Sequence, residues 1–203
     1  VTLGPGMLSR NYDGLQNDLD KMEGVFLRRG EYTFPLDNDK LWDFKPLAKV
    51  GDKVTAGGWL GEVDENFQPH KIMVPFTFKG EYTVKSLKEA GQYTIGEVIA
   101  VLTDETGKDV EVAMIQRWPV KRAITCYKEK PRSYKLLETG VRTIDTVNPI
   151  VEGGTGFIPG PFGTGKTVLQ HAISKQAEAD IVIIAACGER ANEVVEIFTE
   201  FPE

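Results

Sequence analysis

The stretch "GPFGTGKT", residues 160–167, decides how the second half of this chain is interpreted. It matches the pattern GxxxxGK[ST] in full, at Gly160, Gly165, Lys166 and Thr167. Glycines let backbone N–H groups converge on phosphate oxygens without interference from Cβ atoms. The lysine supplies positive charge to the β- and γ-phosphates, and the threonine hydroxyl can bind Mg²⁺. The stretch therefore predicts a loop that binds the phosphates of a nucleotide.

The segments on either side of this loop are those that a phosphate-binding loop requires. Before it, Phe157-Ile158 predicts a short strand. After it, five residues at helical spacing predict a helix: Val168, Leu169, Ala172, Ile173 and Gln176. The continuous apolar run Asp180–Cys187 predicts a strand buried on both faces of a parallel sheet. The order strand, loop, helix, strand predicts an α/β domain in which the helix directs its positive end at the phosphates.

Two charged residues, Glu189 and Arg190, follow the second predicted strand directly, within "CGERANE". Residues that contact ligands gather at the carboxyl ends of strands in open parallel sheets. A carboxylate there could orient the water that attacks the γ-phosphate, and the arginine could pair with phosphate or hold the carboxylate. An equally good interpretation is that both residues cap the N-terminus of a helix over Asn192–Phe201.

The chain changes character near residue 110. Between residues 24 and 105, short alternating runs bounded by Gly, Pro and Asp predict strands, with no helix longer than a turn or two. The runs are Glu31–Leu36, His70–Leu87 and Tyr93–Leu102. Val50–Val63 resembles Glu89–Leu102, and this internal echo is typical of the two halves of a β barrel-sandwich of the biotinyl or lipoyl carrier type. Lys71 is the obvious candidate for a carrier lysine. No turn residues bracket it closely, so we favour a β module without a prosthetic group.

Composition limits the classes of protein that fit. The chain has 203 residues, of which 41% are hydrophobic, and a net charge of -6, which leaves no general basic footprint for nucleic acid. No apolar run approaches the length of about 18 residues that predicts a membrane span. The two cysteines, Cys126 and Cys187, lack metal-type spacing and predict reduced thiols. The chain begins without Met or a signal peptide, so we expect it to be a piece of a longer protein.

Several stretches together resemble the catalytic A subunit of V-type and archaeal A-type rotary ATPases. These are "GPGMLSRNYDG", "WPVK", "LLETGVRTIDTVNPIVEGGTGFIPG", "GPFGTGKT" and "ADIVIIAACGERANEVVEIFTEFPE". The resemblance implies a RecA-like P-loop NTPase domain, begun but truncated, after a β-rich barrel-sandwich bulge domain. It implies three parts: residues 1–23 as core after a missing N-terminal barrel, 24–110 as the bulge insertion, and 111–203 as the first part of the nucleotide-binding domain.

The resemblance also implies roles for particular residues. ATP or ADP would be bound by Gly160, Pro161, Phe162, Gly163, Thr164, Gly165, Lys166, Thr167 and Val168. Thr167 would bind Mg²⁺, Lys166 would act on the phosphates, Glu189 would be the general base and Arg190 would contact the phosphate region. Phe162 would shape the loop, although a role in packing alone is an equal alternative.

The family's activity is ATP hydrolysis or synthesis coupled to H⁺ or Na⁺ transport. The resemblance implies an alternating ring of three A and three B subunits, with an arginine supplied by B, central and peripheral stalks, and indirect attachment to a membrane ion-translocating sector. It places the chain in the cytoplasmic head, peripheral to the membrane, without insertion into it and without nucleic acid. Because that arginine and the later strands are missing, we expect this piece alone to be inactive.

Two other functions are possible from the sequence. The β-rich part could be a binding module that contacts stalk subunits. A RecA-type hexamer that moves along RNA fits poorly, since the chain is acidic.

The chain departs from the family at a few positions. Members often have "DGIQRPL" where this chain has "DGLQNDL", residues 13–19, and eukaryotic members have Cys where this chain has Thr164. The first change concerns local packing, and the second means that no disulfide switch in the loop is implied.

Overall fold

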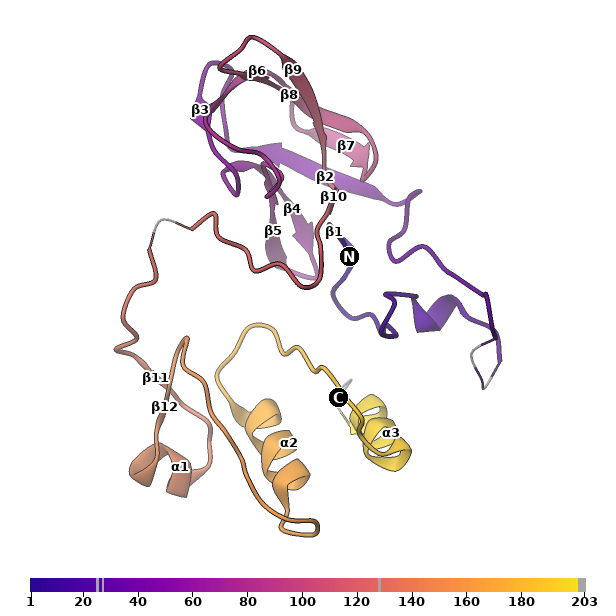
Figure 1. Ribbon diagram of the computed structural model, residues 1–203, viewed down its shortest axis with the longest axis vertical. Coiled ribbons are helices and arrows are strands. Elements are labelled where there is room, and N and C mark those ends of the chain that lie inside the picture. The colour runs from indigo at the N-terminus through magenta and orange to yellow at the C-terminus, as the bar shows by residue number, and fades with distance from the viewer. Residues whose placement is uncertain (25, 27, 128, 201–203) are drawn as a thin grey trace. The chain divides into compact units, whose positions relative to one another are not determined.

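The computed structural model describes residues 1–24, 26, 28–127 and 129–200, and the chain divides into two compact units (Figure 1). The first unit is Val1–Lys128 and the second is Glu129–Glu203. The three-part division predicted from the sequence, with boundaries at residues 24 and 111, stays a prediction.

Short antiparallel strands make up most of the first unit. They are β1 (Thr2–Leu3), β2 (Leu41–Pro46), β3 (Lys53–Val54), β4 (Trp59–Glu65), β5 (Gln68–Met73), β6 (Tyr82–Leu87), β7 (Gly91–Thr94), β8 (Val98–Asp104), β9 (Asp109–Ala113) and β10 (Gln116–Arg117). The only helix among its described residues is one turn of 3₁₀ helix, η1 (Leu19–Lys21). The strands predicted within 70–87 and 93–102 are therefore confirmed, as is the absence of a longer helix in the described part of 24–105.

Eight of these strands form two four-stranded sheets that share one topology. The sheet orders are β5-β4-β2-β7 and β3-β6-β8-β9. When β2, β3, β4 and β5 are matched in order with β6, β7, β8 and β9, the pairs β4–β5, β2–β4 and β2–β7 correspond to β8–β9, β6–β8 and β6–β3. Each sheet therefore corresponds to the other. The β3–β4 and β7–β8 segments, which contain the internal echo, each cross from one sheet to the other. The echo therefore reflects a repeated supersecondary unit.

The repeat extends to a local irregularity. The register shifts between Trp59 and Gly61 in β4 and between Val98 and Ala100 in β8, at corresponding places in the two halves. Such bulges bend a strand and increase its twist, as the strands of a small sandwich require. The two halves differ at the bulge, because the first has Gly61 where the second has Ala100. Gly61 lies against the Phe44 ring and the Lys45 carbonyl oxygen, and a Cβ at this position would overlap the ring.

The core of the first unit consists of two clusters of buried side chains. One cluster contains Leu36, Trp42, Phe44, Val63, Ile72, Ile95, Ile99 and Met114. The other contains Leu60, Val74, Val84, Ala100, Leu102 and Val112. Burial of this apolar area is the main stabilisation available to the sandwich.

Lys71 lies within β5 and not at a hairpin tip. Its register partner across the hairpin is Glu62, and its ammonium makes an ion pair with the Glu62 carboxylate. The ammonium also lies 5.1 Å from the centroid of the Trp59 ring. The β4–β5 turn is made instead by Asn66 and Phe67, both with positive φ. The lysine is therefore held along a strand, unlike a carrier lysine that projects from an exposed turn.

The start of the chain is held to the sandwich by a short stem and by one buried carboxylate. β1 pairs with β10, and the Trp118 amide donates to the Val1 carbonyl oxygen at 2.9 Å. At the end of β4, Glu65 is 2% exposed, and its Oε1 accepts the amides of Gly6 at 2.7 Å and Leu8 at 2.9 Å. Its Oε2 lies 2.7 Å from His70 Nδ1. One side chain thus ties residues 6–8 to the β4–β5 hairpin.

The strand predicted at Glu31–Leu36 is wrong, because its backbone groups bond to side chains of an earlier loop. The Thr33 amide donates to Asn17 Oδ1 at 2.9 Å, and Tyr12 donates to the Pro35 carbonyl oxygen at 2.8 Å. Pro35 also lacks the N–H that a sheet ladder needs. Asn17 and Asp18 stand where the "DGIQRPL" motif has Arg and Pro, and both are buried in this network. Arg10 and Lys21 lie on either side of Asp18 and form ion pairs with it.

The second unit contains small elements: β11 (Leu136–Leu137), α1 (Arg142–Val147), β12 (Ile150–Val151), α2 (Lys166–Gln176) and α3 (Ala191–Glu200). β11 and β12 pair antiparallel. Buried Thr139 donates its amide and hydroxyl to Asp145 Oδ1 at 3.0 and 2.7 Å, which closes the turn into α1. The helices predicted after the loop and after Arg190 are confirmed as α2 and α3, while Phe201 lies outside the described residues.

Two strands predicted in this unit are wrong. Phe157-Ile158 and Asp180–Cys187 have no strand structure, and Ile183 is 87% exposed. A central strand exists only through pairing on both edges and packing on both faces. Neither β11 nor β12, the two strands in the described part of this unit, pairs with these segments. Both buried apolar clusters of the described residues belong to the first unit, and every residue of the run 180–187 except the half-buried Ile184 is exposed.

We predict that Glu65→Gln destabilises the sandwich in a pH-dependent way. Burial raises the pKa of Glu65, but the His70 contact and the amides of Leu8 and Gly6 outweigh it and hold this pKa below its ordinary value. The stabilisation is therefore complete above the unfolded pKa of about 4.3 and is lost as pH falls through the lowered folded pKa. Urea unfolding at pH 7 should show a loss of about 1–3 kcal/mol, because a neutral amide replaces a charged acceptor.

The difference between Glu65→Gln and the parent should shrink as pH falls through the folded pKa. Glu81→Gln, which removes an exposed ion pair with Lys53, is the control and should leave the unfolding midpoint unchanged. A loss for Glu65→Gln that is the same at every pH would contradict this account.

We also predict that Gly61→Ala destabilises the first unit by about 1–3 kcal/mol, because the new methyl group must displace the Phe44 ring or the strand. Denaturant unfolding followed by tryptophan fluorescence measures this effect. Gly96→Ala is the matched control, since a Cβ there meets nothing within 4 Å. Equal midpoints for the two variants would show that the close approach at Gly61 is unimportant.

Candidate phosphate-binding site

The predicted loop folds as a tight turn that leads straight into α2. Gly163 and Gly165 both have φ of 80°, a left-handed conformation that side chains disfavour. Gly165 is the N-cap of α2, and its carbonyl oxygen accepts the Leu169 amide at 2.9 Å. The glycines of the motif therefore permit this backbone, and the positive end of the helix dipole lies at the loop.

The ammonium of Lys166 turns back over its own loop. It donates to the carbonyl oxygens of Gly160 and, at 3.0 Å, of Pro161. The Thr164 hydroxyl donates to the same Pro161 oxygen at 2.8 Å, and a Cβ on Gly160 would lie 2.6 Å from the Thr164 oxygen. Phosphate oxygens are stronger acceptors for an ammonium than these carbonyls, because they carry charge.

The first turn of α3 lies against the loop and the start of α2. The Thr167 hydroxyl donates to Glu193 Oε2 at 3.3 Å, and Arg190 Cζ lies 4.1 Å from the centroid of the Phe162 ring. The structure thus brings together Phe162 and Thr167 with Arg190, which directly precedes α3, and Glu193, in its first turn, although the strand expected between α2 and α3 is not formed.

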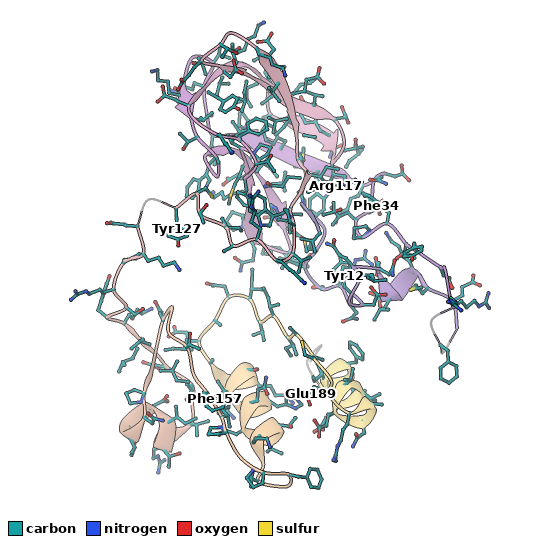
Figure 2. The ribbon with its side chains drawn as sticks, in the orientation of Figure 1. Tyr12, Phe34, Arg117, Tyr127, Phe157 and Glu189 are labelled. Carbon is teal, nitrogen blue, oxygen red and sulfur yellow. The ribbon has the colours of Figure 1, made fainter. Side chains whose placement is uncertain are left out.

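Glu189 lies in the turn that leads into α3, where its side chain can be followed in Figure 2. It is exposed, and within the described ranges its carboxylate has no hydrogen bond or ion pair. The Val194 amide donates to the Arg190 carbonyl oxygen at 3.0 Å, so Arg190 is at the start of the helix, as the capping interpretation expects. The Glu189 side chain itself caps none of the described backbone, which leaves it available to a ligand or water.

Glu193 is the residue that sequence reasoning missed. It lies in the same "CGERANE" stretch, four residues after Glu189 and three after Arg190. On a helix, residues three apart lie on one face. That spacing, together with an acidic residue in the first helical turn, was the available signal. Its contact with the hydroxyl expected to bind metal became visible only in the folded chain.

The remaining predicted residues differ in their surroundings. Val168 is 73% exposed, and in α2 the buried residue is His171 and not one of the apolar positions of the predicted face. The apolar spacing therefore predicted the helix correctly, and Leu169, Ala172 and Ile173 of its apolar face are half-buried, but it did not predict that His171 is buried further.

The side-chain oxygens at the loop suit a Mg²⁺ ion that also binds a phosphate ligand. No group of three or more His, Cys, Asp or Glu side chains that could enclose a metal is found across the described ranges. Mg²⁺ is commonly held by one or two protein oxygens together with substrate phosphates and water. The Thr167 hydroxyl and the Glu193 carboxylate, in mutual contact, match that requirement.

Comparison with known protein families now adds to this geometry. Residues 33–121 match the ATP synthase alpha/beta subunit barrel-sandwich domain, and residues 140–203 match the nucleotide-binding domain of the ATP synthase alpha/beta family. The two matches together cover well over half of the chain.

The chain belongs to the ATP synthase alpha/beta family.

Individual relatives agree with this assignment. The V-type ATP synthase alpha chain of Treponema denticola is 52% identical over 206 aligned residues, which cover 100% of this chain and 35% of the relative. The corresponding chains of Borreliella afzelii, at 50% identity, and Treponema pallidum, at 48%, also align with 100% of this chain. The chain thus spans only 35–36% of the length of these relatives.

The predicted resemblance to V-type rotary ATPases is confirmed, as is the pairing of a barrel-sandwich with part of a P-loop domain. The roles of individual site residues stay predictions. No helix in the portion that the structure describes is long and apolar enough to cross a membrane.

Proposed function

We propose that the protein containing this chain is the catalytic subunit of a V-type rotary ATPase or ATP synthase, which couples ATP hydrolysis or synthesis to H⁺ or Na⁺ transport. The observation that supports this most is the contact between the Gly160–Thr167 loop and the first turn of α3, within a chain of this family. That contact brings the Arg190 guanidinium and the Glu193 carboxylate to the loop that carries Lys166, around a backbone shaped for phosphate.

Each side chain has a role in this proposal. Lys166 exchanges its carbonyl partners for phosphate oxygens and neutralises charge on the β- and γ-phosphates. Arg190 donates to the phosphate region, and backbone N–H groups of residues 160–168 surround the phosphates. Glu189 accepts a proton from the water that attacks the γ-phosphate, or orients that water.

Mg²⁺, when bound, neutralises charge on the phosphates and orients them. Thr167 would hold it directly, and Glu193 would accept a hydrogen bond from its water shell or from the Thr167 hydroxyl. The Thr167–Glu193 contact thus supports a metal role for two residues, where the sequence predicted one.

The proposed setting is a ring of three such subunits alternating with three B subunits, with ATP sites at their interfaces. A neighbouring subunit supplies an arginine, and stalk subunits connect the ring with a membrane ion-translocating sector. The head lies in the cytoplasm, peripheral to the membrane. In this setting the barrel-sandwich follows a two-stranded stem formed by β1 and β10, and contact with a stalk subunit is its proposed role.

We predict that Glu189→Gln abolishes most ATP hydrolysis by the assembled complex while nucleotide binding stays within a few-fold of the parent. A carboxamide keeps the size of the side chain but cannot take a proton, and general-base catalysis contributes about 10²–10⁴-fold in rate. Steady-state turnover and equilibrium binding of Mg-ATP measure the two effects. Glu196→Gln, on an exposed turn of α3, is the control and should leave both unchanged. Unchanged turnover in Glu189→Gln would defeat the assignment.

We predict that Glu193→Gln raises the Mg²⁺ concentration needed for half-maximal hydrolysis by about 10-fold or more, as loss of a residue that supports a metal ligand commonly does. Nucleotide binding measured in excess EDTA should stay unchanged, because Glu193 is expected to act through the metal. Glu196→Gln again serves as the control. If Glu193→Gln weakens binding equally with and without Mg²⁺, the carboxylate acts on the loop and not on the metal.

A further inference from the structure

Phe162 occupies an unusual place for a large apolar side chain. It lies in the phosphate-binding loop and is 78% exposed. Packing into a core therefore does not explain it, since little of its surface leaves water. The contact that the structure does show is with Arg190, whose Cζ lies over the ring at 4.1 Å from the centroid. Cation–π contacts form within about 6 Å, so this one is well within range.

Stacking on a ring restricts a guanidinium without using its hydrogen bonds. Arginine has five N–H donors, and the ring attracts the charge of the guanidinium without supplying an oxygen or nitrogen acceptor for them. Within the described part of the chain, the Arg190 guanidinium has no hydrogen bond or ion pair. Lys166 differs in this respect, because its ammonium already donates to the Gly160 and Pro161 carbonyl oxygens. Arg190 is thus held in place while its donors stay free.

A second contact limits how far Arg190 can move relative to the loop. Glu193, three residues later on α3, accepts the Thr167 hydroxyl at 3.3 Å. Arg190 directly precedes α3, and Glu193 lies in its first turn. The start of α3 therefore touches the loop region at Phe162, through Arg190, and at Thr167, through Glu193, on either side of Lys166 in the sequence.

We propose that Phe162 is a positioning residue for Arg190: its ring holds the guanidinium beside the phosphate-binding loop with the N–H donors free to receive phosphate oxygens. This inference rests on the proposed function. A ring that holds the arginine before the ligand arrives reduces the side-chain entropy lost on binding. The effect belongs to the Phe162–Arg190 pair, and so it must vanish when Arg190 is removed.

The test is a double-mutant cycle on the full-length protein, with Mg-ATP binding measured by titration calorimetry. Phe162→Leu removes the aromatic face but keeps an apolar side chain. We expect it to weaken Mg-ATP binding about two- to fivefold, because a cation–π contact contributes about 0.5–1 kcal/mol. Phe162→Trp, which presents a stronger π face, should bind as tightly as the parent or more tightly. In an Arg190→Ala background, Phe162→Leu should have no further effect.

Phe157→Leu is the matched control, since Phe157 is an 87% exposed phenylalanine that precedes the loop (Figure 2). It should leave the dissociation constant unchanged. Equal losses from Phe162→Leu with and without Arg190 would show that Phe162 only shapes the loop and would overturn the inference, as would tight binding by Phe162→Leu. Absence of nucleotide binding by the parent protein would instead defeat the proposed function.

Discussion

The left-handed backbone at Gly163 and Gly165 is the constraint on which the candidate site depends. It turns the chain sharply enough for α2 to begin at Lys166, and it brings the Lys166 ammonium back over the carbonyl oxygens of Gly160 and Pro161. A Cβ at either glycine would strain this turn. Once the turn is made, Thr167 is on the first turn of α2, where its hydroxyl reaches Glu193. The two glycines therefore place Thr167 where it can meet Glu193, although the position of α3 is decided elsewhere in the fold.

The two units of the chain are stabilised by different means. The first unit buries two apolar clusters between sheets whose pairing repeats, and Glu65 attaches the start of the chain through backbone amides. The second unit is held by local hydrogen bonds, such as those from Thr139 to Asp145, and its run 180–187 is mostly exposed. Burial of apolar surface contributes more to the free energy of unfolding than isolated surface hydrogen bonds do, so the sandwich is the more stable of the two units.

Local patterns predicted local structure well. The spacing of Val168 to Gln176 predicted α2, the stretch after Arg190 predicted α3, and the internal echo predicted the repeated β unit. Patterns that depend on distant partners were less reliable. The alternation in Glu31–Leu36 is typical of a strand, yet those backbone groups bond to Asn17 and Tyr12. No pattern within a segment shows which side chains elsewhere in the chain will compete for its N–H and C=O groups.

By itself, the sequence indicated the family, predicted a phosphate-binding loop and singled out the acidic and basic residues that follow it, because each rests on residue types at short, definite spacings. Only the tertiary structure decided which of these residues meet. It placed Glu193 on Thr167 and Arg190 on Phe162, and it left Glu189 exposed and without a partner within the described ranges. Contacts between residues that are 26 and 28 positions apart depend on where two helices begin and how they face each other, and these properties arise only when the chain is folded.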